Sequence, residues 1–188
     1  INSFEDGAEG GGLSPVVYNF LGGVLNHAKG LTALFAPTVN SYRRLGANMT
    51  ASGSTWSPRY ISYGGNNRSH LLRIPEPGRF ECRLIDGSAN LYLALAGLLA
   101  AGVDGIKNQT SPGKRIDENL FARGSEFPDL ETLPTNLYEA LAALKKNKLL
   151  METLGELGAK TFFEFKYKEW NAFCSQVTDW EMNQYINI

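Results

Sequence analysis

The segment 79–83 alternates charged and apolar residues. In a β-strand alternate side chains share a face, so Phe80 and Cys82 are predicted to point into a core. Arg79, Glu81 and Arg83 are then predicted to stand together on the other face. One carboxylate between two guanidinium groups suits a site that holds a metal ion and several anionic groups at once.

More arginines lie near this segment: Arg68 and Arg73 precede it in the same expected hairpin, and Arg44 lies in the loop before. Arginine binds carboxylates and phosphates through a planar fork, and several arginines on one sheet face repel each other unless anions neutralise them. Glu81 can pair with neighbouring arginines or bind a hard divalent cation. The alternative is a salt-bridged surface without function, in which Arg73 pairs with Glu76.

Three short strands are expected to position these side chains. They are predicted at 60–63, 70–74 and 79–85, and the turn 75–78 joins the last two as a hairpin. Loops are expected at 5–12, 46–58 and 108–134. His27 and His70 are expected at helix-end or surface positions.

Helical periodicity surrounds the strands. Apolar spacing predicts helices over 15–28, 89–102, a segment beginning after Thr135, 149–157 and 162–185. Gly30 is expected to end the first helix. The second is expected to bury a face marked by Leu91, Leu95, Leu98 and Leu99.

Composition narrows the possible classes. The chain has 188 residues, of which 43% are hydrophobic and 20% charged, as in one globular domain or a large part of a bigger protein. A net charge of −1 argues against a nucleic-acid binder. The uncharged run 87–103 is shorter than the ~20 residues of a membrane span, so a buried core helix is expected and no membrane partner. Two cysteines form no disulfide framework, which favours a cytoplasmic location. The chain opens at Ile1 without a signal segment and reads as if it starts mid-sequence.

Three ordered motifs carry a family resemblance. They are Ala-Pro-Thr-Val-Asn-Ser-Tyr-Arg-Arg-Leu over 36–45, Asn67-Arg68-Ser69 with Arg73-Ile74-Pro75, and the segment 79–83 continued to Asn108. Together they resemble the C-terminal part of the glutamine synthetase family, closely over 13–109 and loosely beyond. The Ser/Thr-rich loop and the ending around Trp170 are most similar to the type III branch, which also resembles γ-glutamylmethylamide synthetases.

The resemblance implies an α+β fold in which an antiparallel sheet lined by arginines carries helices packed outside. Residues 1–188 are then the C-terminal part of the catalytic domain, and the N-terminal domain is absent from the chain. The implied activity is an ATP-dependent ligation of ammonia to the side-chain carboxylate of L-glutamate through γ-glutamyl phosphate. The implied cofactors are ATP and Mg²⁺ or Mn²⁺, and the implied assembly is a large double-ring homo-oligomer.

Residue roles follow from the motifs. By resemblance Arg44 and Arg83 bind substrate glutamate. Arg68 and Arg73 contact the transferring phosphoryl group and the nucleotide phosphates, with Arg68 as the catalytic residue. Because the rest of the family's site lies outside these residues, the chain alone is expected to be inactive.

The resemblance also implies roles for the outer strand. Arg79 faces the nucleotide, and Glu81 is one ligand of a divalent metal.

The sequence departs from the family pattern in two places. Ammonia-using members carry a glutamate in the loop that matches 46–58, where this chain has no acid. Methylamine therefore stays open as the acceptor. Phe121 stands near the tyrosine of enzymes regulated by adenylylation, which argues against that regulation, with Tyr138 as a distant alternative. A non-catalytic fragment that binds anions or partner subunits is the reading from a different class.

Overall fold

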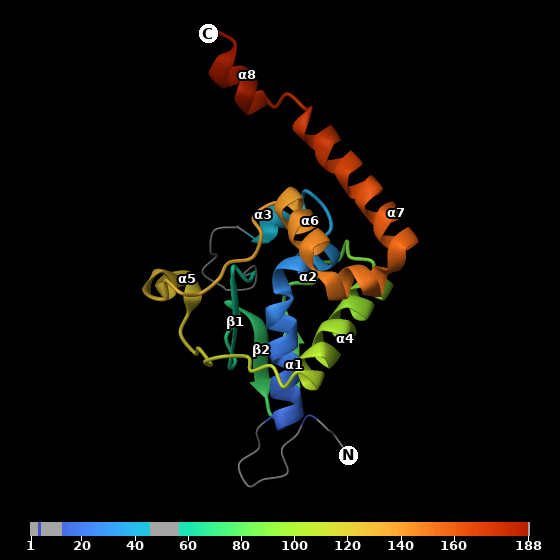
Figure 1. Cartoon of the computed structure of the whole chain (residues 1–188). Coiled ribbons are helices and arrows are strands. Elements are labelled where there is room, and N and C mark those ends of the chain that lie inside the picture. The colour runs from blue at the N-terminus through green and yellow to red at the C-terminus, as the bar shows by residue number, and fades with distance from the viewer. Residues whose placement is uncertain (1–3, 5–12, 46–56, 188) are drawn as a thin grey trace.

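Three strands form one sheet, and helices pack against it (Figure 1). The computed structural model describes Phe4, residues 13–45 and residues 57–187. The expected loop at 5–12 and residues 46–56 of the second expected loop lie outside the described residues. The helices are α1 (Pro15–Asn26), α2 (Ala28–Phe35), α3 (Ser41–Leu45), α4 (Leu91–Lys107), α5 (Leu120–Arg123), the 3₁₀ helix η1 (Gly124–Glu126), α6 (Leu137–Lys146), α7 (Lys148–Cys174) and α8 (Asp179–Tyr185).

The sheet has the order β1 (Tyr60–Gly64), β2 (His70–Glu76), β3 (Arg79–Cys82). β2 and β3 form the expected antiparallel hairpin. The α+β class is confirmed, but the sheet is mixed rather than wholly antiparallel, because β1 pairs parallel to β2. Residues 65–69 connect β1 to β2 and are held by two hydrogen bonds, from Gly65 N to Asp117 Oδ1 and from Leu120 N to Ser69 Oγ. They do not form the tight turn that joins two antiparallel strands in a hairpin.

One face of the sheet packs against α1. This helix begins at Pro15, which fits the first turn because its missing N–H has no partner there. Phe20 of α1 lies 5.7 Å from Phe80 of β3, measured between ring centroids. The predicted inward direction of Phe80 and Cys82 is confirmed, and burial raises the pKa of the Cys82 thiol to about 11. Charged residues of β3 are thereby left to the opposite face.

The helix after α1 differs from the expectation. α1 ends at Asn26, and α2 continues through Gly30 to Phe35. A Cβ on Gly30 would lie 3.0 Å from Leu150 Cδ1, so the small residue is needed for helix packing and not for a chain reversal. Similarly, residues 108–134 are not all loop, because α5 and η1 form within them.

The expected leucine face of α4 is also wrong. Leu91, Leu95 and Leu99 are exposed, and only Leu98 packs partly against the core. The buried residues of α4 are small ones: Ala94, Gly97, Ala101, Gly102 and Gly105.

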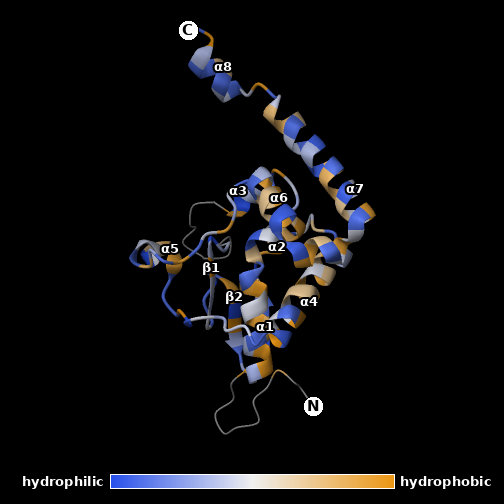
Figure 2. Cartoon of the chain, in the orientation of Figure 1, coloured by the Kyte–Doolittle hydropathy of each residue, from blue (hydrophilic) through white to orange (hydrophobic). Residues whose placement is uncertain are grey.

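The C-terminal helices extend away from the body (Figure 1). α7 contains a break at Gly155, whose φ of 68° favours glycine, and beyond it the helix runs outward to α8. Apolar and polar residues mix along this arm (Figure 2), and α8 buries none of its residues. Among the described helices, none combines the length and the apolar character needed to cross a membrane.

Candidate functional site

The β2–β3 hairpin brings one carboxylate between two guanidinium groups. Arg73 lies directly opposite Glu81 across the antiparallel pair. Its Nη1 donates to Glu81 Oε2 at 2.5 Å, and Arg83 Nη1 donates to Glu81 Oε1 at 2.8 Å. Both oxygens of the carboxylate therefore have an arginine partner, in the charge-assisted geometry that is stronger than a neutral hydrogen bond.

The electrostatics of these groups reflect their crowding. Partial burial acts to raise the pKa of Glu81, but the hydrogen bonds and charges of Arg73 and Arg83 outweigh it, so the pKa lies below its usual value. Burial lowers the pKa of Arg83, helped by repulsion from Arg73 and Arg68 and opposed by Glu81. Two cations thus share one carboxylate, and Arg68 adds a third positive charge that is felt at Arg83. We call Arg68, Arg73 and Arg83 around Glu81 the arginine cluster; such an excess of positive charge attracts further anions.

Arg68 reaches the cluster from the turn before β2. Arg83 Nε donates to the Arg68 backbone carbonyl at 3.2 Å, while the Arg68 residue itself is exposed. Asn67 fixes this turn: its Oδ1 accepts from the Ser69 amide and its Nδ2 donates to the Glu118 carbonyl at 2.8 Å. The segment before α5 therefore holds the backbone that carries Arg68.

Arg79 does not join the cluster. The expected pairing of Arg79 with Glu81 is wrong, because Arg79 Nε pairs with Glu76 Oε1 at 3.0 Å near the hairpin turn. Both side chains are more than half exposed, at 62% and 61%. The alternative pair of Arg73 with Glu76 is wrong as well, since Arg73 lies opposite Glu81 and pairs with it, whereas Glu76 lies opposite Arg79.

Arg44 lies on α3, on the other side of the segment that follows β3. Its Nη2 donates to the Leu84 carbonyl at 2.8 Å, and its buried Nε has no hydrogen-bond partner among the described residues. It lines a cavity of about 230 Å³ with Asp86, Ser41, Thr38, Asn40, Gly87 and Ser88. Burial acts to raise the pKa of Asp86, but hydrogen bonds from Ser41 and Ser88 and the charge of Arg44 lower it overall. Arg44 therefore contacts the backbone directly after Arg83, and the lining of its cavity does not include Arg83.

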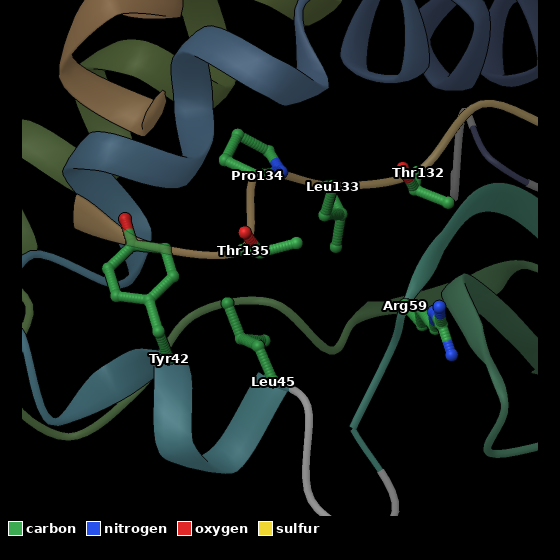
Figure 3. A pocket seen from close by; sticks show the side chains of 7 residues that line it. All are labelled: Tyr42, Leu45, Arg59, Thr132, Leu133, Pro134 and Thr135. Atoms are coloured by element: carbon green, nitrogen blue, oxygen red, sulfur yellow. The ribbon is translucent and has the colours of Figure 1, made fainter. Parts of the chain in front are cut away.

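A second cavity lies beside α3 (Figure 3). It measures about 270 Å³, and its lining joins Tyr42 and Leu45 of α3 to Arg59 and the segment 132–135. Burial, with nearby negative charges, raises the pKa of the Tyr42 hydroxyl, which keeps its proton at neutral pH. This cavity contains none of the predicted site arginines.

The described residues offer no complete set of metal ligands of their own. Within the described residues, no group of three or more His, Cys, Asp or Glu side chains could hold a metal ion. Glu81 fits the role of one oxygen ligand, because it is ionised and its side chain is 41% exposed. The arginine cluster fits phosphate groups, since its cations outnumber its carboxylate.

Sequence reasoning missed Asn66, Asp117 and the position of His70. Asn66 Oδ1 accepts from Arg73 Nε at 3.0 Å and from Arg73 Nη2, and Asp117 accepts from the Gly65 amide at 2.8 Å. Asn66 directly precedes the motif at Asn67, which offered a signal, whereas nothing near Asp117 did. His70 is fully buried and not on the surface, with its Nδ1 3.0 Å from Ser62 Oγ, and burial lowers its pKa to about 4. His27 does lie at a helix end, as expected.

Comparison with known proteins identifies the family. Residues 1–185 match the family model described as glutamine synthetase, catalytic domain. A glutamine synthetase of Rhizobium leguminosarum bv. phaseoli is 43% identical over the whole chain, and a glutamate–methylamine ligase of Methyloversatilis universalis is 44% identical, also over the whole chain. The chain covers only 43% of the length of each relative.

Solved structures agree with these matches. A GmaS/ADP complex superimposes with a TM-score of 0.90 at 50% identity, covering 99% of this chain and 43% of that one. Ligand-free GmaS superimposes with a TM-score of 0.87 at 47% identity, covering 41% of that chain. The chain therefore belongs to the glutamine synthetase family.

Proposed function

We propose that the complete protein is an ATP-dependent ligase that joins an amine to the side-chain carboxylate of L-glutamate. The observation that carries this proposal is the arginine cluster, in which Arg73 and Arg83 pair with one carboxylate and Arg68 adds a third positive charge, within a chain of this family. A reaction that brings glutamate and nucleotide phosphates together concentrates negative charge. Preorganised cations stabilise such charge as the phosphoryl group moves.

Each arginine receives a role from its place. Arg68 and Arg73 contact the transferring phosphoryl group and the nucleotide phosphates, and Arg68 is the catalytic residue because its exposed side chain can reach the substrate. Arg83 and Arg44 bind the glutamate substrate, and Arg44 is held beside Arg83 by its hydrogen bond to the Leu84 carbonyl. Arg79 contacts the nucleotide from the hairpin end, where it is exposed.

Glu81 supplies one ligand to Mg²⁺ or Mn²⁺ in this proposal. Its ionised state and the oxygen-rich preference of both ions support the role. The other ligands are proposed to lie in the part of the ligase outside this chain. A bound divalent ion neutralises phosphate charge, while Arg73 and Arg83 orient the carboxylate that holds it.

The reaction proceeds by activation and then displacement. Phosphoryl transfer from ATP makes γ-glutamyl phosphate, and the amine attacks its carbonyl carbon, so that the C–N bond forms and phosphate leaves. Ammonia is the default acceptor, giving glutamine, as the names of several relatives suggest.

Methylamine is the second candidate acceptor. It is favoured by the lack of any acid in the loop 46–58 and by the similarity to a glutamate–methylamine ligase and to GmaS structures. Ammonia-using members of the family carry a glutamate in this loop, and its absence sets this chain apart from them. Either amine is mostly protonated at neutral pH, so the ligase needs a base from another segment.

Steady-state assays on a chimera test both acceptors. In the chimera this chain replaces the matched region of the Rhizobium leguminosarum relative, and phosphate release is measured with glutamate, ATP and either ammonium or methylamine.

Arg83→Lys should raise the KM for glutamate, because lysine cannot form the bidentate contact. Arg123→Ala is the matched control, since exposed Arg123 pairs with Glu126 away from the cluster. A folded chimera that releases no glutamate-dependent phosphate with either amine contradicts the proposed reaction.

The remaining reading is a non-catalytic fragment that binds anions or partner subunits. It predicts phosphate binding by Arg68 and Arg83 without turnover in any longer polypeptide.

The complete ligase is proposed to act in the cytoplasm, which suits the free cysteines, and to form a large homo-oligomer. The exposed aromatic residues of α7 and α8 support such an assembly.

A further inference from the structure

Helix α4 carries small residues on one face and large apolar residues on the other. The face toward the body is made of small residues that allow close approach. A Cβ on Gly97 would lie 3.0 Å from Leu31 Cδ2 and Leu34 Cδ1, and a Cβ on Gly102 would overlap the Phe20 ring. Large side chains are therefore excluded from the packed side.

The large apolar side chains of α4 gather on the other face. Leu91, Leu95, Leu99 and Val103 recur at every fourth position, which places them in one stripe along the helix. Their exposed fractions are 67%, 54%, 56% and 42%, and neighbouring Tyr92 is 87% exposed. We call these five residues the α4 stripe. Nothing in the described part of the chain covers it.

The stripe has the chemistry of a buried contact. Residues 87–103 contain no charged side chain, and charged residues are depleted from the cores of interfaces. Burying a leucine is favourable in proportion to the apolar area that is removed from water. A stripe of this size on a free surface marks an interaction site.

We propose that the α4 stripe is the docking surface for the rest of the ligase polypeptide. The relatives are more than twice as long as this chain, which covers 43% of their length, so most of their polypeptide has no counterpart here. The occupant presents an uncharged apolar surface to α4 within the same polypeptide. This proposal rests on family membership and the exposed stripe, and it does not depend on the reaction or on the acceptor amine.

A second copy of the chain is the competing occupant. The outer part of α7 and α8 also exposes apolar residues, among them Phe165, Trp180 and Ile186. If such an arm covered the stripe, coverage would depend on protein concentration and would disappear in a monomer. Covering by the same polypeptide is independent of concentration.

Cysteine labelling measures the coverage directly. Leu95→Cys and, separately, Leu99→Cys are placed in a Cys174→Ser background, in the 188-residue chain and in the chimera described above. Maleimide addition is followed by mass spectrometry. Cys82 serves as an internal reporter of folding, because its buried thiol reacts slowly as long as the sheet is intact.

The expected result is fast labelling in the chain and at least about tenfold slower labelling in the chimera, since a covered thiol reacts only through local opening. Leu157→Cys on α7 is the matched control, because Leu157 is 78% exposed and lies outside the stripe. Its labelling rate should be similar in both proteins. The protection of Leu95→Cys should persist after mild dissociation to a monomer, as verified by light scattering.

Two results overturn the proposal. Equal labelling of the stripe in the chain and the chimera means that the rest of the ligase does not cover it. Protection that is lost on dissociation, or that appears in the chain alone at high concentration, assigns the stripe to a second copy. If Cys82 of the chimera labels rapidly, the same cysteine is placed at the aligned position of the unmodified relative, and its protection decides the question. Activity does not enter any of these readouts.

Discussion

Glu81 is the residue on which the charges of the site depend. Its two oxygens accept hydrogen bonds from Arg73 and Arg83, whose side chains are only 16% and 14% exposed. Loss of this carboxylate leaves two nearly buried cations facing each other. An uncompensated charge of that kind is costlier than the loss of the pair itself.

Glu81→Gln should therefore affect both stability and metal use. In the chain, the free energy of unfolding should fall by about 1 kcal/mol, because Glu81 is partly exposed and its hydrogen bonds are partly screened. In the chimera, the concentration of Mg²⁺ needed for half-maximal activity should rise by about tenfold. Urea unfolding and metal titration of the rate measure these effects.

The matched control for Glu81 is Glu76→Gln, which breaks the exposed pair with Arg79 and should cost less than about 0.5 kcal/mol. The contribution of Glu81 to the free energy of unfolding also depends on pH. Because the fold lowers the pKa of Glu81, this stabilisation is fully present above the unfolded pKa and is lost as the pH falls through the folded pKa. Normal metal dependence in Glu81→Gln is the outcome that excludes the metal role.

His70 should make the protein less stable in acid. Burial lowers its pKa from 6.5 to about 4, so the folded state keeps it neutral while the unfolded state takes up a proton. Stability is thus complete above pH 6.5 and declines as the pH falls toward 4, by about 1–3 kcal/mol after screening is allowed for. His70→Gln should flatten the free energy of unfolding across this window. An unchanged slope in the variant contradicts the buried, neutral imidazole.

At the scale of elements, the hairpin was predictable and its pairing was not. Alternation of apolar and charged residues predicted the face of Phe80 and Cys82 correctly. The partner of Glu81 depends on the register between β2 and β3, which shifts between Arg73 and Glu76. One such irregularity changes which residue lies opposite Glu81, so the sequence pattern alone could not identify Arg73 as its cross-strand partner.

The helices show a similar limit. Periodicity predicted α1 and α4, but it could not tell which side of α4 meets the body. Leucines normally mark the buried side, whereas here glycines do, because the backbones of α1 and α4 approach closely. The prediction that Gly30 ends the first helix was wrong for the same reason. Gly30 lies inside α2 and allows this helix to pack closely against Leu150.

The close approach of α1 and α4 is tested by Gly105→Ala. A Cβ at this position would lie 2.5 Å from Gly23 N and would overlap the Asn19 carbonyl. Overpacking of backbone against backbone should cost about 1–3 kcal/mol of unfolding free energy. Gly158→Ala is the control, because nothing lies within 4 Å of the added methyl and alanine should stabilise the helix by about 0.5–1 kcal/mol. Equal effects of both substitutions rule out the tight contact.

A second element-scale prediction concerns the link between α7 and α3. Glu169 Oε1 accepts from the Val39 amide at 3.0 Å, and its other oxygen pairs with Lys166 at 2.9 Å. Val39 lies two residues before α3, which carries Arg44. Helix α7 thereby constrains the segment that places a proposed glutamate-binding residue.

Glu169→Ala should loosen this segment, because it removes the acceptor of the Val39 amide. Amide hydrogen exchange at residues 38–41 should accelerate, and the KM for glutamate of the chimera should rise about fivefold while the KM for ATP stays constant. Glu164→Ala is the matched control, because Glu164 is an exposed acid on the same helix. Equal changes in both KM values mean that Glu169 stabilises the fold in general and does not position Arg44.

At the scale of the whole molecule, the candidate site draws on segments far apart in the chain. The hairpin supplies Arg73, Glu81 and Arg83, the segment before α5 fixes the turn of Arg68, and α7 constrains the approach to Arg44. Three features then remain open to the outside: the surplus positive charge, the carboxylate of Glu81 that is proposed as a metal ligand, and the α4 stripe. All three are accounted for if a longer ligase polypeptide completes this chain.

Helix α8 lies at the end of the arm that extends from the body of the molecule (Figure 1). α8 has no buried residue and is held at its start by the capping box of Thr178 and Glu181. Removing residues 177–188 should therefore change the free energy of unfolding of the body by less than about 0.5 kcal/mol. In the chimera, the same removal should reduce the oligomer size seen by light scattering, because the exposed Trp180 and Tyr185 are proposed to pack against a neighbouring subunit. Thr178→Ala is the control that weakens only the cap, by about 1 kcal/mol of helix stability. A shortened chimera that keeps its full size shows that the arm is not an assembly contact, and the oligomer must then be held by other surfaces of the ligase.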